Sequence, residues 1–524
     1  MKFWWALLLV SFTTAAQENP DIIIRNGKII DGTGNSWYYG DVAIKAGKIV
    51  RIGKLNTVKA AKEIDATGFI ISPGFIDVHT HIEGDEVANP EATNFIYDGV
   101  TSVVTGNCGG SRPDLKKYFS MLDSMEISVN VASLIGHNTV RKAIIGAANR
   151  DPNADELLKM QALVEQAMKD GAVGLSTGLI YIPGTYSKTP EIIALAKMAS
   201  KYNGLYASHM RNEGDSVVQA IEEAIMIGKE ANLPVEISHF KVSGQQNWGR
   251  SNETIAMVVK AREAGLDVTI DQYPYTASST SLSTLLPDWI LSDGDDSVKA
   301  RLKRPEIRRL AKDEMIKSLN RRKLMHFSYA VVAYHEADTT LNGKSIEEIN
   351  RLKGRPLTSI YEAETIIELM EKGGAGMVFH GMSEDDIKNI MRYPFNMFAS
   401  DASIRIFNQG VPHPRGYGTN ARVLSKYVRE EKVISLEEAI RRMSSLPAQK
   451  FQLKNRGLIK EGFAADILVF NEKEVQDMST FNQPHQYSKG FKYVLVNGQV
   501  VVDNGKHTGV RSGKVLWGPG VVLN

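Results

Sequence analysis

The fold is decided by residues 73–81, which read PGFIDVHTH. Residues 75–78 are a short apolar run typical of a buried strand, and the run ends at His79. His79 and His81 are two residues apart, so on an extended chain their side chains point the same way. The stretch therefore predicts a buried strand that carries chemistry at its carboxyl end.

Seven more apolar runs follow the first, and helix-like segments such as 155–169 and 190–201 lie between them. These runs end near residues 105, 135, 178, 208, 238, 270 and 400. Eight repeated strand–helix units predict an α/β fold of the (β/α)₈ TIM-like barrel type, covering residues 73–450. In such a barrel the carboxyl ends of all the strands meet on one face, where active sites are built.

One interval is far longer than the others. About 30 residues separate His209 from His239, whereas 128 residues separate Tyr273 from Asp401. An insertion is therefore expected between the seventh and eighth strands, at about residues 283–390. An excursion of this length at a barrel mouth is typical of a lid or a small subdomain. The alternative is a spacer that takes no part in binding.

Both ends of the mature chain are rich in short strands and turns. Asn26-Gly27 and Asn497-Gly498 are hairpin signals between apolar runs. Neither end alone has enough apolar residues for a core of its own. We therefore expect residues 17–72 and 451–524 to join in one small β-sandwich domain beside the barrel.

The composition excludes several classes of protein. The 524 residues are 43% hydrophobic and 23% charged, which excludes a wholly disordered chain. The formal net charge is +2 and no long basic run occurs, so no nucleic-acid partner is expected. The single cysteine, Cys108, excludes an intrachain disulfide. The expected partner is a small-molecule substrate.

The first residues have the pattern of a secretory signal peptide. Lys2 precedes an apolar run at residues 3–10, and Thr14-Ala15-Ala16 supplies small residues before a cleavage site after Ala16. We therefore expect residues 1–16 to be a signal peptide and the mature protein to be periplasmic or secreted. The alternative is an uncleaved anchor. No later apolar stretch is long enough to span a bilayer, so no stable membrane insertion of the mature protein is expected.

Metal-binding residue types follow the predicted strands at several points. Imidazole and thiolate groups are preferred zinc ligands. Six candidate ligands exceed what one tetrahedral zinc takes while keeping an open position, which predicts two adjacent metal positions. His137 also follows a strand, and it is expected either to support a metal ligand or contact substrate, or to be purely structural. The six candidate ligands are His79, His81, Cys108, His209, His239 and Asp401.

These motifs resemble those of the amidohydrolase superfamily, and within it those of the D-aminoacylase (N-acyl-D-amino-acid deacylase) family. The resemblance covers essentially the whole mature chain. Many superfamily members carry a carbamylated lysine on the fourth strand, but residues 172–180 contain no lysine; this family has a cysteine after the second strand instead. The matching segments are PGFIDVHTH (73–81), TGNCG (105–109), SHMR (208–211), ISHFK (237–241), YPYTASS (273–279), SD (400–401) and HPR (413–415).

The resemblance implies a role for each matching residue. Cys108, His209 and His239 would hold the tighter zinc, and His79, His81 and Asp401 would surround the weaker position. Asp401 would be the general base and acid. The α-carboxylate of the substrate would be bound by Arg415, Tyr273 and Ser279. Lys241 lies two residues after His239, so it would contact substrate or fix a ligand.

The expected function is zinc-dependent hydrolysis of the amide bond of N-acyl-D-amino acids, which releases a carboxylate and a D-amino acid. Two alternatives within the superfamily are a D-aminoacyl dipeptidase and a cyclic amidase of the hydantoinase or dihydroorotase type. An alternative of another class is a non-catalytic assembly or binding protein. The side-chain and acyl-group preferences do not follow from these motifs.

Overall fold

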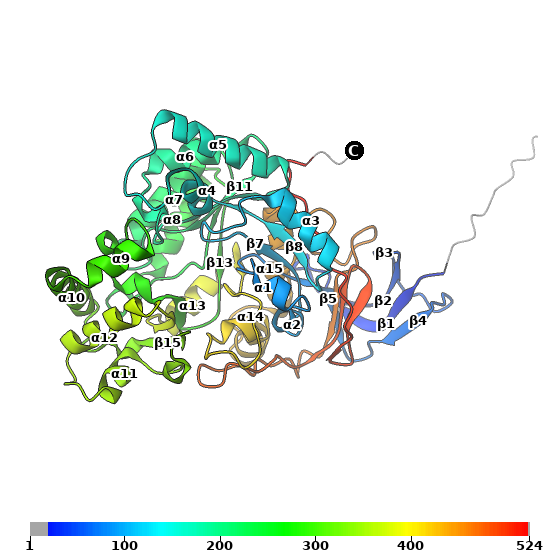
Figure 1. The fold of residues 1–524 in the computed structure, drawn as a ribbon. Coiled ribbons are helices and arrows are strands. Elements are labelled where there is room, and N and C mark those ends of the chain that lie inside the picture. Colours follow the sequence, from blue (N-terminus) through cyan, green and yellow to red (C-terminus); the bar gives the residue numbers. More distant parts are fainter. Residues whose placement is uncertain (1–18, 522–524) are drawn as a thin grey trace, which may run out of the picture.

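The computed structural model describes residues 19–521, and its centre is a barrel of eight parallel strands (Figure 1). The third strand is interrupted at Leu134, which splits it into two short strands. This arrangement confirms the predicted barrel. The strands are β6 (Phe75–Asp77), β7 (Val100–Thr105), β8 with β9 (Asn130–Ser133 and Ile135–Gly136), β10 (Gly174–Gly178), β11 (Leu205–His209), β12 (Val235–Ile237), β13 (Val268–Gln272) and β17 (Asn396–Phe398).

Backbone hydrogen bonds close this ring of strands. β6, β7 and β8 form one ladder, and β9 to β13 with β17 form another. The ladders meet on one side where Val173 N donates to Ser133 O at 2.9 Å. On the other side Asp401 N donates to His79 O and His81 N donates to Ala402 O, both at 2.9 Å. The first and last strands are therefore joined at residues predicted to bind metal.

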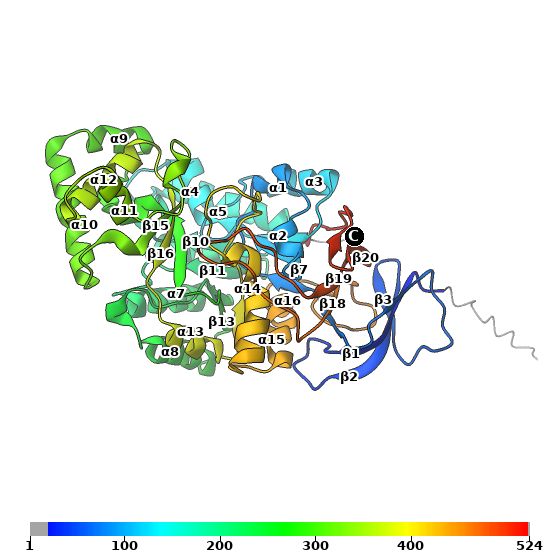
Figure 2. The same cartoon turned by 90° about the horizontal axis from the view of Figure 1, so that it is seen from below.

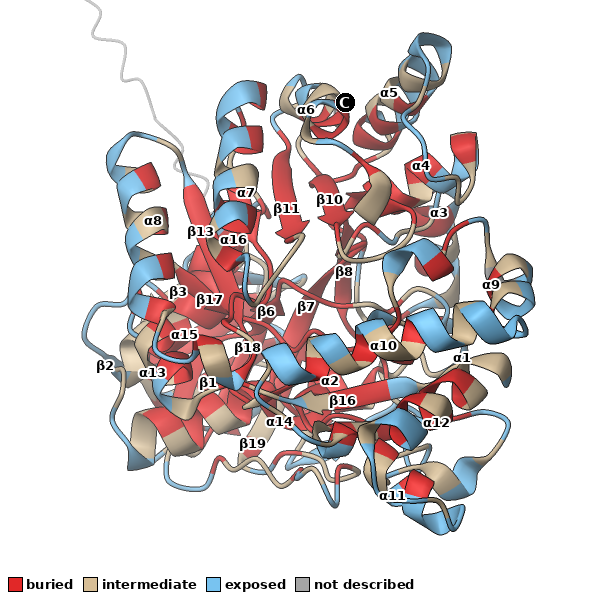
Figure 3. Cartoon of the chain, turned by 90° about the vertical axis from the view of Figure 1, so that its left-hand side faces the viewer, coloured by how far each residue is buried: buried red, intermediate tan, exposed pale blue. Residues whose placement is uncertain are grey.

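Helices cover the outside of the barrel, with one side buried and the other exposed (Figure 3). The buried residues are mainly apolar, such as Met160 and Val164 in α5 and Ile221 and Ile227 in α7. α5 begins with a capping box, in which Asn153 accepts from Glu156 N and the Glu156 carboxylate accepts from Asn153 N. The covering helices are α3 (Leu115–Met125), α4 (His137–Ile145), α5 (Ala154–Lys169), α6 (Thr189–Ser200), α7 (Val217–Ala231), α8 (Ser251–Glu263), α13 (Glu384–Met391) and α15 (Leu436–Met443). The short helix α16 (Ser445–Lys450) belongs to another apolar cluster, in which its Leu446 lies with Ile76 of β6 and Ala207 of β11.

The predicted insertion is a subdomain with an apolar core of its own, which includes Leu302, Ile366 and Met377. It begins earlier than predicted because its first strand, with the sequence ASSTS, lacks the apolar alternation of a strand. It also ends earlier, since α13 packs against α8 as a barrel helix. Its elements are β14 (Ala277–Ser281), α9 (Asp295–Leu302), α10 (Pro305–Arg321), β15 (Ala330–Tyr334), α11 (Ile346–Leu352), α12 (Ser359–Glu371) and β16 (Gly376–His380).

The two chain ends form one β-domain, which lies at the opposite end of the molecule from the insertion (Figures 1 and 2). Its strands belong to one hydrogen-bonded sheet of nine, in which β5 pairs with both β1 and β18. The sheet curls so that Ile49 and Leu495, near its two ends, share one apolar core. The strands are β1 (Ile22–Ile29), β2 (Tyr38–Lys45), β3 (Lys48–Gly53), β4 (Lys62–Asp65), β5 (Ile70–Pro73), β18 (Ile467–Phe470), β19 (Phe491–Val496), β20 (Gln499–Asp503) and β21 (Lys506–His507).

The expected signal peptide, residues 1–16, lies outside the described residues. Within residues 19–521 no helix has the length and apolar character needed to cross a bilayer.

A glycine after β7 provides a test of how closely the barrel ends are packed. Gly106 has φ +77°, and a Cβ there would collide with the carbonyl oxygen of Leu134. Gly249 has a similar φ of +88°, but open space surrounds it. We expect Gly106→Ala to lower the free energy of unfolding by about 3 kcal/mol, because backbone strain and a backbone clash add. Gly249→Ala should cost about 1 kcal/mol. Chemical denaturation measures both variants, and equal losses would contradict the packing argument.

Candidate metal centre and active site

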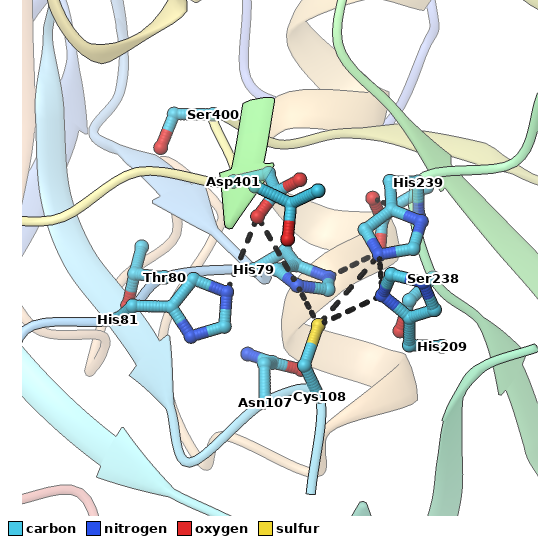
Figure 4. Close-up of polar contacts among 12 residues, drawn as sticks. His79, Thr80, His81, Asn107, Cys108, His209, Ser238, His239, Ser400 and Asp401 are labelled. Carbon is cyan, nitrogen blue, oxygen red and sulfur yellow. Dashed lines mark hydrogen bonds and ion pairs between the residues drawn. The ribbon is translucent and has the colours of Figure 1, made fainter. Parts of the chain in front are cut away.

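Three donor atoms, from Cys108, His209 and His239, converge at the carboxyl ends of the strands (Figure 4). Cys108 Sγ lies 3.3 Å from His209 Nδ1 and 3.6 Å from His239 Nε2. These two nitrogens are themselves 2.8 Å apart. One thiolate and two imidazole nitrogens facing a common point are a donor set that fits Zn²⁺.

A second group of donors adjoins the first and shares Cys108. His79 Nε2 lies 3.2 Å from Cys108 Sγ and 3.6 Å from Asp401 Oδ1. His81 Nε2 lies 3.2 Å from the same Asp401 oxygen. The structure therefore brings together all six residues that the sequence proposed as ligands (Figure 4). They form overlapping groups of three, in which Cys108, His79 and His239 each belong to two groups.

Three of the six candidate ligands have a left-handed backbone. The φ angles are +52° at Cys108, +37° at His239 and +50° at Asp401. For a residue with a Cβ this conformation costs about 1–3 kcal/mol. It is held by hydrogen bonds such as that from His239 N to Asp271 Oδ1, at 2.8 Å. Strain of this kind collects at functional sites, where it aims side chains inward.

Electrostatics favour the metal-binding form of Cys108. Burial raises the pKa of its thiol, but the nearby His79 and His209 imidazoles outweigh burial and hold that pKa well below the usual range. The thiolate is the form that binds metal.

Asp401 is ionised and held by a buried arginine. Burial raises the pKa of this carboxyl, but Arg415, and after it His79, keep the pKa well below its usual range. Arg415 Nη1 lies 2.9 Å from Asp401 Oδ2. Arg415 is only 3% exposed, and its guanidinium stacks 4.5 Å from the Tyr273 ring centre. The Asp401 carboxylate, which can accept a proton, thus lies between the Arg415 guanidinium and the candidate metal ligands.

The other residues proposed to bind substrate surround the same arginine. Ser279 accepts from Arg415 Nη2 through its backbone carbonyl, at 3.2 Å. Lys241 Nζ lies 5.5 Å from the ring centre of Tyr273, on which Arg415 also stacks. Within residues 19–521, Arg415 Nε and Tyr273 Oη are buried without a hydrogen-bond partner. An unsatisfied buried polar group costs about 1–3 kcal/mol, so these two atoms are suited to bind a ligand.

His137 is not placed to contact substrate. The side chain is fully buried, its Nε2 donates to Glu191 Oε1 at 2.8 Å, and its Nδ1 lies 3.3 Å from Asn138 Oδ1. Glu191 also pairs with buried Arg141. The expectation of substrate contact is therefore corrected in favour of the structural alternative, because both ring nitrogens already face groups of the protein.

Two acidic residues at the site were not identified from the sequence. Asp271 lies 3.4 Å from His79 Nδ1 through its Oδ2, and Glu213 lies 2.9 Å from His239 Nδ1. Asp271 directly follows the apolar run at 268–270, which is the signal that marked the other strand-end residues. Glu213 lies four residues beyond His209, in a loop, and no periodic pattern marks it.

A cavity of about 750 Å³ opens beside the candidate metal ligands, between barrel loops and the insertion. The insertion contributes Thr280, Arg322 and His380 to its wall, and the barrel contributes Tyr181 and Glu213. The hydroxyls of Tyr181 and Thr280 are 2.9 Å apart and connect the two sides. The insertion therefore forms part of the chamber next to the site, as expected of a lid rather than of a spacer.

The model of the amidohydrolase family matches residues 62–502. The chain therefore belongs to the amidohydrolase family. It is 32% identical over 519 residues to the D-aminoacylase of Alcaligenes xylosoxydans, an alignment that covers 95% of this chain and 97% of that protein. Within the amidohydrolases the chain belongs to the D-aminoacylase group.

Solved structures agree with this placement. The N-acyl-D-glutamate deacylase of Bordetella bronchiseptica, complexed with zinc and a phosphonate inhibitor, is 33% identical with a TM-score of 0.81, covering 95% of this chain and all of that one. A D-aminoacylase structure described for one-metal activation and second-metal attenuation of a binuclear centre has a TM-score of 0.80 at 33% identity, covering 95% of this chain and 99% of that one. A Thermus hydantoinase has a TM-score of 0.58 at 15% identity, and the match covers 95% of this chain and 99% of the hydantoinase chain. This likeness shows a shared fold alone.

Zinc content should separate the two clusters. We expect Cys108→Ser to lose most of its bound zinc, because it removes the only thiolate and the atom common to both clusters. His81→Ala should retain one tightly bound zinc, since His81 lies in the second cluster only. Elemental analysis after dialysis measures both, with His326→Ala, a histidine paired with Glu362 in the insertion, as control. Equal zinc loss in the Cys108 and His81 variants would contradict the assignment.

Proposed function

We propose that this chain is a zinc-dependent hydrolase that cleaves the amide bond of N-acyl-D-amino acids, releasing a carboxylate and a D-amino acid. The observation that carries the proposal is the placement of ionised Asp401 between the metal-type donors and Arg415, a buried cation with an unused donor. The deacylases to which the chain is similar act on compounds of this class.

Asp401 is suited to move the proton that amide hydrolysis requires. When bound to the cluster, zinc supplies Lewis-acid chemistry, by which it activates water and polarises a carbonyl. Asp401, ionised at neutral pH, takes the proton from the attacking water. It then gives that proton to the departing nitrogen, which leaves as an amine. The same carboxylate therefore acts first as base and then as acid.

Arg415 and Tyr273 are suited to hold the α-carboxylate of the substrate. A guanidinium presents a planar fork that matches a carboxylate, and a phenolic hydroxyl adds a further donor. Burial raises the pKa of Tyr273 more than Lys241 and Arg415 lower it, so its hydroxyl keeps its proton. Because Arg415 also touches Asp401, the bound carboxylate would place the scissile amide next to the proton acceptor.

One tight zinc, held by Cys108, His209 and His239, is proposed to suffice. A second ion between His79, His81 and Asp401 would engage the carboxylate oxygens that move the proton. Occupation of both positions would therefore compete with catalysis.

The alternatives make distinct demands on the site. A D-aminoacyl dipeptidase would use the same groups on the same kind of bond, with an aminoacyl group in place of the acyl group. A cyclic amidase is disfavoured, since the hydantoinase compared above shares the fold alone. A non-catalytic role is disfavoured because all six candidate ligands converge.

We further propose that the protein is exported, because residues 1–16 have the charge and apolar pattern of a signal peptide. The mature enzyme would then act in the periplasm or outside the cell.

Paired substrates test the proposed activity. We expect the purified, zinc-loaded protein to release amine from N-acetyl-D-amino acids and not from their L-counterparts, in a panel of methionine, leucine, glutamate and aspartate. A hydantoin and a D-dipeptide belong in the same assay. Hydrolysis confined to either of these would leave the metal centre in place but contradict the proposed substrate class.

Asp401→Asn should separate catalysis from metal binding. An amide at this position cannot accept the proton of water, so kcat should fall by about 10²–10⁴-fold. The tight zinc should remain, because Asp401 lies outside the cluster of Cys108, His209 and His239. Steady-state kinetics and zinc content are measured on the same preparation. A variant that keeps its kcat would show that another group moves the proton.

A further inference from the structure

A partly buried glutamate, Glu213, whose side chain is 14% exposed, touches two functional side chains at once. Its Oε1 lies 2.9 Å from His239 Nδ1 and accepts a hydrogen bond from Lys241 Nζ at 2.5 Å. The same oxygen lies 3.9 Å from His209 Nε2. Two of the three side chains that face the tight zinc position therefore have their second nitrogen turned toward this carboxylate.

Backbone contacts fix the position of Glu213. Its loop follows β11, and the backbone carbonyl of Glu213 accepts from Ser243 N at 2.7 Å, which links this loop to the one after β12. Asn212 Oδ1 accepts from Gly214 N at 2.9 Å and stabilises the turn. The side chain is held as well, because its Oε1 pairs with the Lys241 ammonium at 2.5 Å.

The contact between Glu213 Oε1 and His239 Nδ1 determines which ring nitrogen of His239 carries the hydrogen. His239 Nε2 faces Cys108 Sγ and His209 Nδ1, so Nε2 must carry the free electron pair if the ring is to bind a metal. A neutral imidazole then carries its hydrogen on Nδ1 and needs an acceptor there. Lys241 Nζ lies 2.8 Å from Nδ1, but an ammonium has no acceptor. Glu213 supplies the acceptor for Nδ1.

The opposite tautomer would disable the site. If Lys241 donated to Nδ1, the ring hydrogen would sit on Nε2 and point at the thiolate and His209. Lys241 instead has two other acceptors, the Glu213 carboxylate and the His239 backbone carbonyl, the latter at 2.7 Å. Glu213 thus accepts from the imidazole and also accepts a lysine hydrogen that could otherwise be donated to Nδ1.

We propose that Glu213 is a positioning residue that selects the zinc-binding tautomer of His239 and anchors Lys241 beside Tyr273. The first half stands on the geometry of the ligand cluster. The second half, in which Lys241 faces substrate, rests on the proposed function.

Zinc competition tests the first half without any substrate. We expect the full-length Glu213→Gln variant to bind zinc about 10–100-fold more weakly against a fluorescent chelator, because a neutral amide oxygen is a weaker acceptor for His239 Nδ1–H and no longer pairs with the Lys241 ammonium. Asp215→Asn is the matched control: it lies on the same loop, and its carboxylate accepts from Gln246 and Asn247 rather than from a ligand. Its zinc affinity should be unchanged. Equal affinities of the two variants would overturn this half.

A second variant keeps the test informative if glutamine disturbs folding, which circular dichroism would reveal. Glu213→Asp retains the charge but shortens its reach, so we expect a zinc affinity between those of the wild type and the glutamine variant. An aspartate variant that folds and binds zinc as tightly as the wild type would also overturn the first half, since the shorter carboxylate cannot keep the 2.9 Å contact in place.

Coupling kinetics test the second half. Glu213→Gln and Lys241→Met should each raise KM for an N-acyl-D-amino acid at saturating zinc. If Glu213 acts on substrate through Lys241, the double variant should raise KM no further than Lys241→Met alone. Independent, multiplying effects would overturn this half. Absence of deacylase activity in the wild type would instead refute the proposed function, and the zinc measurement would still stand.

Discussion

Two backbone hydrogen bonds, from Asp401 to His79 and from His81 to Ala402, unite the first and last strands of the barrel. The barrel and the site both depend on this closure, because the hydrogen bonds that complete the ring of strands are made by candidate ligand residues. The proton acceptor and two imidazoles are positioned by the same contacts that complete the ring. The same hydrogen bonds thus join the first and last strands and bring together residues more than 300 positions apart in sequence.

The site is built at a cost in stability. Three ligand residues hold a left-handed backbone, and Arg415 and Tyr273 keep buried donors for which the described part of the chain offers no partner. Strain and unmet hydrogen bonds of this kind each cost about 1–3 kcal/mol. A large barrel core and the closure bonds offset this cost. Such losses of stability are typical of functional sites, where the side chains are arranged to bind a ligand.

Much of this organisation could be predicted from the sequence, because parallel strands are buried on both faces and read as apolar runs. The six candidate ligands follow directly from that, since each comes just after a run. The start of the insertion was missed because β14 is polar, so periodicity did not reveal it. His137 follows a strand as the others do, but it is the first residue of α4, which turns it toward Glu191. Glu213 was missed because its role depends on a contact between two loops.

The β-domain is assembled from segments that precede and follow the barrel in the sequence. β5 pairs with β1 on one side and with β18 on the other. Until residues 467–470 have been synthesised, β5 has an open edge, so this sheet is completed only after the barrel strands have been made. A nascent or truncated chain would thus display an unpaired strand, which is a template for aggregation. The strands that follow the barrel are therefore needed to cover the open edge of β5.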